Sequence, residues 1–108
     1  MPYLVIVYDH LDKQGDKKPH RDAHHAYLAA QGTRLLSSGA LLDESGTQTI
    51  GGVALLDTDE REDAVRFEAE DPYAIAGIRQ SVEIIPWRLN WWLGNFERQG
   101  HHPSQKQA

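Results

Sequence analysis

Apolar and β-branched residues gather in four short runs that predict β-strands, at residues 3–9, 37–43, 47–56 and 81–89. The first run is almost continuously apolar, as expected of a strand that is buried on both faces. The turn sequence Glu-Ser-Gly at residues 44–46 joins the second and third runs and predicts a hairpin. Gly51 and Gly52 in the third run indicate a bulge or a close backbone approach. Pro86 has no N–H for a neighbouring strand, which predicts that the last strand lies at a sheet edge.

The segment between the first two runs predicts a loop followed by a helix. Residues 10–19 are polar and typical of a loop. Residues 20–36 are rich in alanine and contain no proline, and apolar side chains recur there at helical spacing. Gly32 weakens the last turns of this helix, so the sequence leaves its end open.

A second helix is predicted after the third run. Thr58 can serve as its N-cap, and acidic residues follow in the first turn, where the helix dipole favours negative charge. The helical pattern extends to about Glu70. Pro72 disfavours a helical backbone at Asp71, and a short helical turn is expected at residues 74–77.

The predicted order, β-α-β-β-α-β, is that of the ferredoxin-like split-βαβ fold, an α+β arrangement with both helices on one face of an antiparallel sheet. The strand runs supply apolar side chains to both faces of that sheet, yet two helices can cover only one. We therefore expect a homodimer in which the open sheet faces of two copies pack together. Trp87, Trp91 and Trp92 are candidate anchors of this interface.

Composition and charge narrow the class of protein. The 108 residues fit one domain, expected at residues 1–95, with a polar C-terminal tail at 96–108. The net charge of −5 argues against a nucleic-acid partner. Because there is no cysteine, disulfides and thiolate metal sites are excluded. No membrane span and no basic-flanked signal segment is recognisable, so a cytoplasmic protein without a membrane partner is expected.

Two ionisable residues stand on the apolar stripes of the predicted helices. His24 lies near the centre of the stripe on the first helix, and Asp71 follows Ala64 and Phe67 at i, i+3, i+7 spacing on the second. Ionisable side chains are seldom fully buried unless they are paired. We therefore expect His24 and Asp71 to meet, and a His–carboxylate pair is suited to proton transfer.

Each of these residues also has a structural interpretation. An aspartate before a proline commonly caps the following turn, and a lone histidine on an apolar face is usually a core residue. His20 and His24 have the i, i+4 spacing of a metal site on one helix face, but the third ligand has no obvious position, with His10 and Asp9 as the nearest candidates. We therefore predict no metal, and the case for a functional site rests on His24 and Asp71 occurring together.

Three further residues are candidates for binding a substrate. Arg21 can hold an anionic group, Tyr8 at the end of the first strand can donate a hydrogen bond, and Ser38 lies near the start of the second strand. Each also has an ordinary interpretation as a surface, packed or loop residue. No glycine-rich phosphate loop and no Gly-x-Ser-x-Gly nucleophile motif is present, and no cofactor is predicted.

Several short blocks resemble the YCII-related (YciI-like) family. Residues 21–24, Arg-Asp-Ala-His, resemble its Arg-x-x-His segment, and Gly39 falls where its members have Gly-Pro after the second strand. Residues 71–73, Asp-Pro-Tyr, resemble its Asp-Pro-aromatic block, and residues 82–87 resemble its closing strand. The blocks follow the family's order and spacing over about residues 3–89.

The resemblance implies a dimeric α+β barrel of ferredoxin-like subunits with an active site on a His–Asp pair, here His24 and Asp71. It also adds Gly39 and Tyr73 to the candidate substrate-binding residues. One branch of the family has a fold similar to that of muconolactone isomerase and eliminates chloride from a chlorinated hydroxyquinol. The chain departs from the family pattern at Ala40, where proline is usual, and in an aromatic extension after the last strand.

Two functions from different classes fit these observations. The first is a small-molecule enzyme of the lyase, isomerase or dehydrochlorinase-like kind, in which His24 moves a proton on a cyclic or aromatic metabolite and Asp71 orients the imidazole. Its pocket is expected between helix and sheet, lined by Tyr8, Tyr27 and Trp87. The second is a non-catalytic dimeric ligand-binding or accessory module, in which the His–Asp pair is structural. RNA binding on the sheet is disfavoured by the charge and by the missing aromatic signature.

Overall fold

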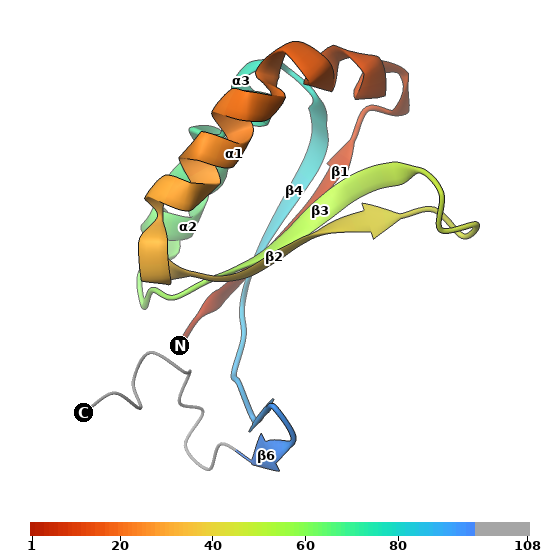
Figure 1. The fold of residues 1–108 in the computed structure, drawn as a ribbon. Helices are drawn as coiled ribbons and strands as arrows, with labels where there is room; N and C mark the ends of the chain where they lie inside the picture. The colour runs from red at the N-terminus through yellow and green to blue at the C-terminus, as the bar shows by residue number, and fades with distance from the viewer. Residues whose placement is uncertain (97–108) are drawn as a thin grey trace.

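The computed structural model describes residues 1–96, so all but the first residue of the predicted tail at 96–108 lies outside the described residues. The main body has two layers, a four-stranded sheet and a layer of helices (Figure 1). The strands are β1 (Tyr3–Asp9), β2 (Leu35–Leu42), β3 (Thr49–Leu56) and β4 (Arg79–Pro86). The helices are α1 (Arg21–Ala30), α2 (Arg61–Ala69) and α3 (Pro72–Ile75), with 3₁₀ segments η1 (Leu11–His20) and η2 (Gly32–Arg34).

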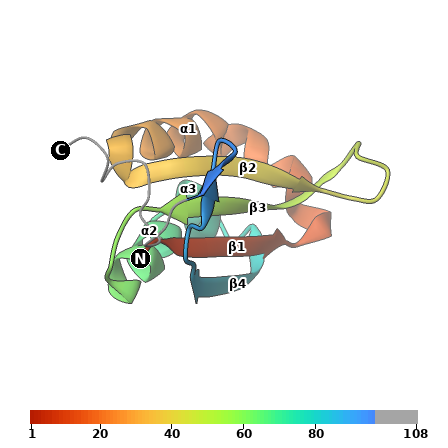
Figure 2. The same ribbon diagram turned by 90° about the horizontal axis from the view of Figure 1, so that it is seen from below.

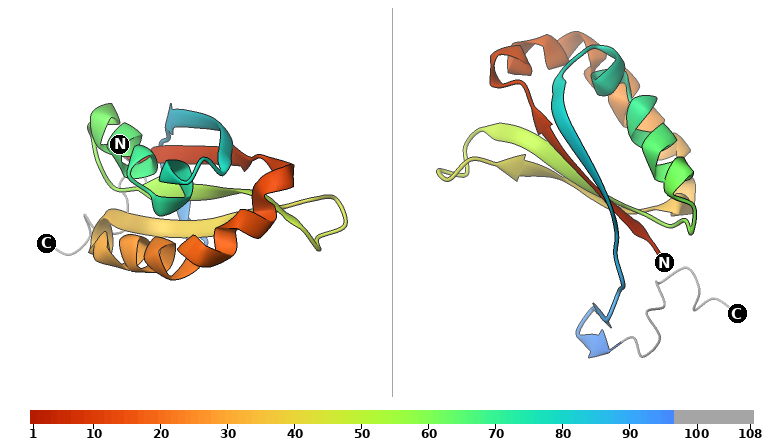
Figure 3. Two further views of the ribbon diagram at one scale, coloured as in Figure 1. Left: turned by 90° about the horizontal axis from the view of Figure 1, so that it is seen from above. Right: turned by 180° about the vertical axis from the view of Figure 1, so that it is seen from behind.

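The main sheet confirms the predicted α+β fold class. Its strand order is β2-β3-β1-β4, and each neighbouring pair is antiparallel. β4, which ends at Pro86, lies at the edge, as the proline predicts. Figure 2 shows the strands from the side of the sheet that faces away from the helices, and Figure 3 shows α1 and α2 over the opposite face.

The hydrophobic core lies between the sheet and the helices. Val5 and Val7 of β1 point toward the helices and are buried with Ala54 of β3 and Phe67 of α2. The intervening side chains of β1 point to the other face, where Tyr8 is 41% exposed. The prediction that the first strand is buried on both faces is therefore wrong for the single chain, because no helix within residues 1–96 covers that face.

The first helix is shorter than predicted. α1 ends at Ala30, and Gly32 adopts a φ of 60°, a left-handed conformation that glycine reaches without a steric penalty. The chain turns there through η2, so Leu35 and Leu36 begin β2 instead of ending the helix. The polar segment predicted as a loop forms η1, which leads directly into α1.

The second helix begins later than predicted. Glu60, not Thr58, is the N-cap residue of α2, and the Thr58 hydroxyl instead accepts a hydrogen bond from the Glu60 backbone N–H and donates one to Asp63. α2 ends at Ala69, close to the predicted end. The predicted break at Asp71 is present, and the short helix after it begins at the next residue, earlier than expected.

Close backbone packing explains the pair of glycines in β3. A Cβ atom on Gly51 would overlap the carbonyl oxygen of Val7 on the neighbouring strand, so the predicted close approach is confirmed. The predicted hairpin between β2 and β3 is also present, and Gly46 adopts a φ of 74° in its turn.

A small two-stranded hairpin follows β4. Its strands are β5 (Trp91–Trp92) and β6 (Asn95–Phe96), and it lies on the side of the main sheet away from the helices (Figures 1 and 3). The side chain of Leu93 at its turn is 84% exposed. Within residues 1–96, no helix has both the length and the apolar content needed to cross a membrane.

Candidate functional site

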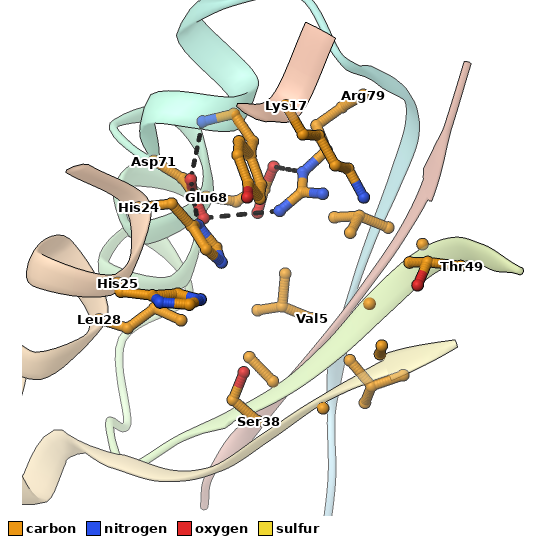
Figure 4. Close-up of a pocket in the computed structure, with 18 of the residues that line it drawn as sticks. Val5, Lys17, His24, His25, Leu28, Ser38, Thr49, Glu68, Asp71 and Arg79 are labelled. Atoms are coloured by element: carbon orange, nitrogen blue, oxygen red, sulfur yellow. Dashed lines mark hydrogen bonds and ion pairs between the residues drawn. The ribbon is translucent and has the colours of Figure 1, made fainter. Parts of the chain in front are cut away.

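A cavity of about 380 Å³ lies between α1 and the sheet, a volume typical of small-molecule sites. Its floor consists of small and apolar residues of β1 and β3, among them Val5, Val7, Gly52 and Ala54. Its wall on the helix side carries Arg21, His24 and His25 from α1. Figure 4 shows His24 and His25 extending from α1 towards this cavity, opposite the strands that carry Val5 and Ser38.

His24 and Asp71 meet at the wall of the cavity. The Nδ1 atom of His24 lies 2.8 Å from the Oδ1 atom of Asp71, which is hydrogen-bond distance. The side chain of Asp71 is 2% exposed and that of His24 is 15% exposed. The contact forms because α1 presents His24 inward while Pro72 ends the helical path at Asp71, which holds the carboxylate between α2 and α3.

The other contacts of Asp71 decide which imidazole nitrogen carries a proton. Oδ1 of Asp71 also accepts a hydrogen bond from the Tyr73 backbone N–H at 2.9 Å, and Oδ2 lies 3.5 Å from Nη2 of Arg79. A carboxylate surrounded by donors acts as an acceptor, so in the neutral imidazole we assign the proton to Nδ1 of His24. The lone pair of Nε2 then points away from Asp71 and into the cavity (Figure 4).

Tyr73 fixes the plane of the imidazole. Its ring stacks on that of His24, with centroids 4.0 Å apart and planes inclined by 15°. Two cations lie near the same tyrosine ring, Lys17 Nζ at 5.3 Å and Arg79 Cζ at 5.5 Å from its centroid. The aromatic ring therefore contacts both the imidazole and the cationic part of the site.

A buried ionic cluster lies behind the His–Asp pair. Nη1 of Arg79 is 2.9 Å from Asp9 Oδ1, and Nε of Arg79 is 3.1 Å from Glu68 Oε2. Nζ of Lys17 is 2.6 Å from the other Asp9 oxygen. Antiparallel pairing of β1 with β4 places Asp9 opposite Arg79, and α2 supplies Glu68 from above the sheet. With Asp71, the guanidinium thus contacts three carboxylates.

Burial and charge shift the pKa values of this cluster in opposite directions. Burial raises the pKa of Glu68 to about 7, because the nearby Arg79 charge offsets only part of the lost hydration. Burial would also raise the pKa of Asp9, but hydrogen bonds from Lys17, Gln14 and Arg79 hold it below its ordinary value. Burial would lower the pKa of Arg79, but Glu68 and Asp9 raise it above its ordinary value. The cluster therefore combines a firmly ionised aspartate with a glutamate that can be neutral near pH 7.

The structure brings most of the predicted site residues together. Besides His24 and Asp71, the cavity is lined by four of the five predicted substrate-binding residues, Arg21, Ser38, Gly39 and Tyr73. Tyr8 is the exception, since strand alternation directs its side chain to the opposite face of the sheet. The predicted lining by Tyr27 and Trp87 is also wrong: the Tyr27 hydroxyl donates to the Phe67 carbonyl at 2.9 Å, and Trp87 lies beyond the end of β4.

Sequence reasoning missed Lys17, Glu68 and Arg79, which also line the cavity. A signal for Glu68 was available, because it lies four residues after Ala64 and so shares the inward stripe that leads to Asp71. Arg79 opens an edge strand, and its position depends on the register of β1 and β4. Lys17 comes from η1, whose polar sequence gives no periodic signal.

Among residues 1–96, no three histidine, aspartate or glutamate side chains are arranged so that they could hold a metal ion. The Nδ1 atom of His24 is already engaged by Asp71.

Comparisons with known proteins match the chain to a family model and to solved structures. The family model of the YCII-related domain matches residues 1–88, so the match ends before the β5–β6 hairpin. A similar solved structure is that of 5-chloro-2-hydroxyhydroquinone dehydrochlorinase from Burkholderia phenoliruptrix AC1100 in complex with 2,5-dihydroxybenzoquinone. The two structures align with a TM-score of 0.73 and 21% sequence identity, over 81% of this chain and 93% of that chain. A comparison with curated proteins gave no significant match.

Proposed function

Because this chain belongs to the YCII-related domain family, we propose that it is a small-molecule enzyme of the lyase, isomerase or dehydrochlorinase-like kind. His24 is the general base and Asp71 orients it. The observation that carries the proposal is the 2.8 Å contact between Nδ1 of His24 and Oδ1 of Asp71 at the wall of a cavity, which leaves Nε2 free to face a ligand.

In the proposed step, Nε2 of His24 takes a proton from the bound molecule, and the imidazole becomes an imidazolium. The Asp71 carboxylate stabilises the new positive charge through its hydrogen bond to Nδ1–H. In the dehydrochlorinase-like version the electron pair left by the proton expels chloride as the carbon–chlorine bond breaks. In the isomerase version a proton returns to a different atom of the same molecule.

The shape of the cavity supports a cyclic or aromatic metabolite as substrate. Its sheet side carries the small side chains of Ala40 of β2 and Ala54 of β3 and the backbone of Gly52, which together form a surface of small apolar groups. Arg21 at the wall is exposed and suits an anionic substituent, as the phenolates of hydroxyquinols would be. The ring-shaped ligand named for the structural neighbour is consistent with this substrate class.

Chloride release from 5-chloro-2-hydroxyhydroquinone provides the test. We expect release by the natural chain and a decrease of about 100-fold or more in His24→Asn and in Asp71→Asn. His20→Asn is the matched control, because His20 ends η1 and does not line the cavity. Equal rates in all four proteins would contradict the proposal, and no release by the natural chain would reject its dehydrochlorinase-like form.

A non-catalytic ligand-binding module is the alternative, and one observation favours it. Asp71 caps α3 through the Tyr73 N–H and Tyr73 stacks on His24, so the His–Asp pair also ties α1 to α3. Under this function, both substitutions lower the melting temperature, and 2,5-dihydroxybenzoquinone binds without being chemically changed.

We also infer that the protein is a homodimer formed through the open face of the sheet. Strand register places Leu4, Ile6 and Ile85 on that face, and Ile85 is 39% exposed in the single chain. A sheet face that carries several apolar side chains and is not covered by a helix is typical of a protein–protein interface. A second copy covers such a face by two-fold symmetry.

A further inference from the structure

The buried ionic cluster behind the His–Asp pair contains more carboxylates than cations. Asp9, Glu68 and Asp71 are each 5% exposed or less, and Arg79 and Lys17 are the cations in contact with them. With the His24 imidazole neutral, as its role as a base requires, three ionised carboxylates and two cations leave a net charge of −1 in a buried cluster. Burial penalises uncompensated charge, so the cluster favours holding one proton on a carboxylate.

The hydrogen bonds identify which carboxylate holds that proton. Asp9 accepts from Gln14 at 3.0 Å in addition to its ion pairs with Lys17 and Arg79. Asp71 has His24, the Tyr73 N–H and Arg79 as partners.

Glu68 is the least satisfied of the three carboxylates. In the part of the chain that the structure describes, its hydrogen-bond donor is Arg79 Nε alone, which contacts Oε2 at 3.1 Å. The second carboxylate oxygen of Glu68 can therefore be protonated without breaking an existing hydrogen bond of the cluster. Glu68 also lines the cavity, so that a proton held there is within reach of a ligand.

We propose that Glu68 is a second proton-exchanging residue of this cavity, which holds the proton of the buried carboxylate cluster and delivers it to the bound molecule. The inference rests on the proposed function and deepens it. His24 removes a proton from one atom of the ligand, and Glu68 donates its proton to another atom or to a leaving group. In an isomerisation the ligand loses one proton to His24 and gains one from Glu68. Proton exchange with solvent then restores the neutral imidazole of His24 and the protonated carboxyl of Glu68.

The electrostatic surroundings of Glu68 support its role as proton donor beside His24 as the base. Burial raises the pKa of Glu68 to about 7, so both protonation states are accessible at neutral pH. The groups around it come from every neighbouring element, namely Asp9 of β1, Lys17 of η1, His24 of α1, Asp71 and Tyr73 at the start of α3, and Arg79 of β4. Asp9 and Asp71 favour the neutral glutamic acid, and Arg79 favours the carboxylate.

Carbon NMR of the full chain labelled with [¹³Cδ]glutamate tests the inference without a substrate. We expect one side-chain carboxyl resonance to titrate at about pH 7, to be missing in Glu68→Gln and to persist in Glu70→Gln. Glu70 is a suitable control, because it is an exposed residue at the end of the same helix and does not line the cavity. The inference is overturned if every carboxyl titrates in the ordinary acidic range.

The same samples are then titrated with 2,5-dihydroxybenzoquinone as the probe. We expect the Glu68 resonance to shift when the probe is added, in the natural chain and in Glu70→Gln alike. A resonance that titrates at about pH 7 but ignores the probe would make Glu68 a structural acid and overturn the inference.

The outcome is separable from that of the proposed function. If Glu68 titrates as an ordinary carboxyl while His24→Asn abolishes chloride release, this inference alone fails. If His24→Asn and Asp71→Asn leave chloride release unchanged, the proposed function fails, whatever the Glu68 resonance does.

Discussion

Oδ1 of Asp71 accepts hydrogen bonds from two directions, from Nδ1 of His24 at 2.8 Å and from the backbone N–H of Tyr73 at 2.9 Å. The first contact joins residues 47 positions apart, and the second caps α3. One buried carboxylate therefore orients the imidazole and anchors the short helix on which Tyr73 stands. The functional and the structural interpretation of Asp71 describe the same geometry.

Substitutions of Asp71 should separate these two roles. Asp71→Ala removes the cap and is expected to lower the free energy of unfolding by about 1 kcal/mol more than Asp71→Asn, whose amide oxygen still accepts from the Tyr73 N–H. Urea unfolding of both variants measures the difference. Equal losses of stability would show that the cap contributes nothing measurable.

The raised pKa of Glu68 predicts how stability depends on pH. Because the folded chain holds this proton up to about pH 7 while an unfolded glutamate releases it near its ordinary pKa of 4.5, stability falls as pH rises between these values. The loss due to this group is expected to reach about 3 kcal/mol at most. Urea unfolding at a series of pH values should show a flatter profile for Glu68→Gln than for Glu70→Gln, and parallel profiles would contradict the prediction.

Two glycines of the sheet should respond differently to the same substitution. A Cβ on Gly51 meets the Val7 carbonyl, whereas a Cβ on Gly39 meets nothing within 4 Å. Gly51→Ala must push β3 away from β1, so we expect a loss of 3 kcal/mol or more, on the order of the largest single-residue effects. Gly39→Ala should stay within about 0.5 kcal/mol of the natural chain. The melting temperatures of both variants, monitored by circular dichroism, test this difference. Similar melting temperatures would contradict the close backbone approach at Gly51.

The open face of the sheet predicts the oligomeric state. Analytical ultracentrifugation at micromolar concentration should give a dimer for the natural chain and a monomer for Ile85→Glu, which places a charge on that face. Ile75→Glu is the control, because Ile75 of α3 is 73% exposed on the helix side of the molecule. A natural chain that sediments as a monomer would refute the dimer, and a dimer unaffected by Ile85→Glu would place the interface elsewhere.

The strands and the His–Asp contact could be predicted from the sequence because both depend on local periodicity. β1 matches its predicted bounds, and the inward stripes place His24 and Asp71 on facing surfaces. The end of α1 could not be predicted in the same way, since Leu35 and Leu36 continue its apolar pattern and only the left-handed turn at Gly32 redirects the chain.

The remaining parts of the site depend on tertiary register. Arg79 reaches Asp9 because β1 and β4 pair with a shift beyond Tyr8, which no local pattern encodes. The prediction that Tyr8 lines the pocket rests on its place at the end of the first strand, whereas simple alternation from Val7 directs its side chain to the opposite face of the sheet. The same alternation would have assigned Asp9 to the helix side, where it lies.

Nitrogen NMR of the His24 ring tests the central claim most directly, because the proposed base is Nε2 and its availability depends on the tautomer. At a pH where the ring is neutral, we predict a proton on Nδ1, an unprotonated Nε2 whose resonance shifts when 2,5-dihydroxybenzoquinone is added, and loss of this tautomer preference in Asp71→Ala, which removes the acceptor of the Nδ1 proton. A proton on Nε2, or an Nε2 resonance that ignores the probe, would contradict the account.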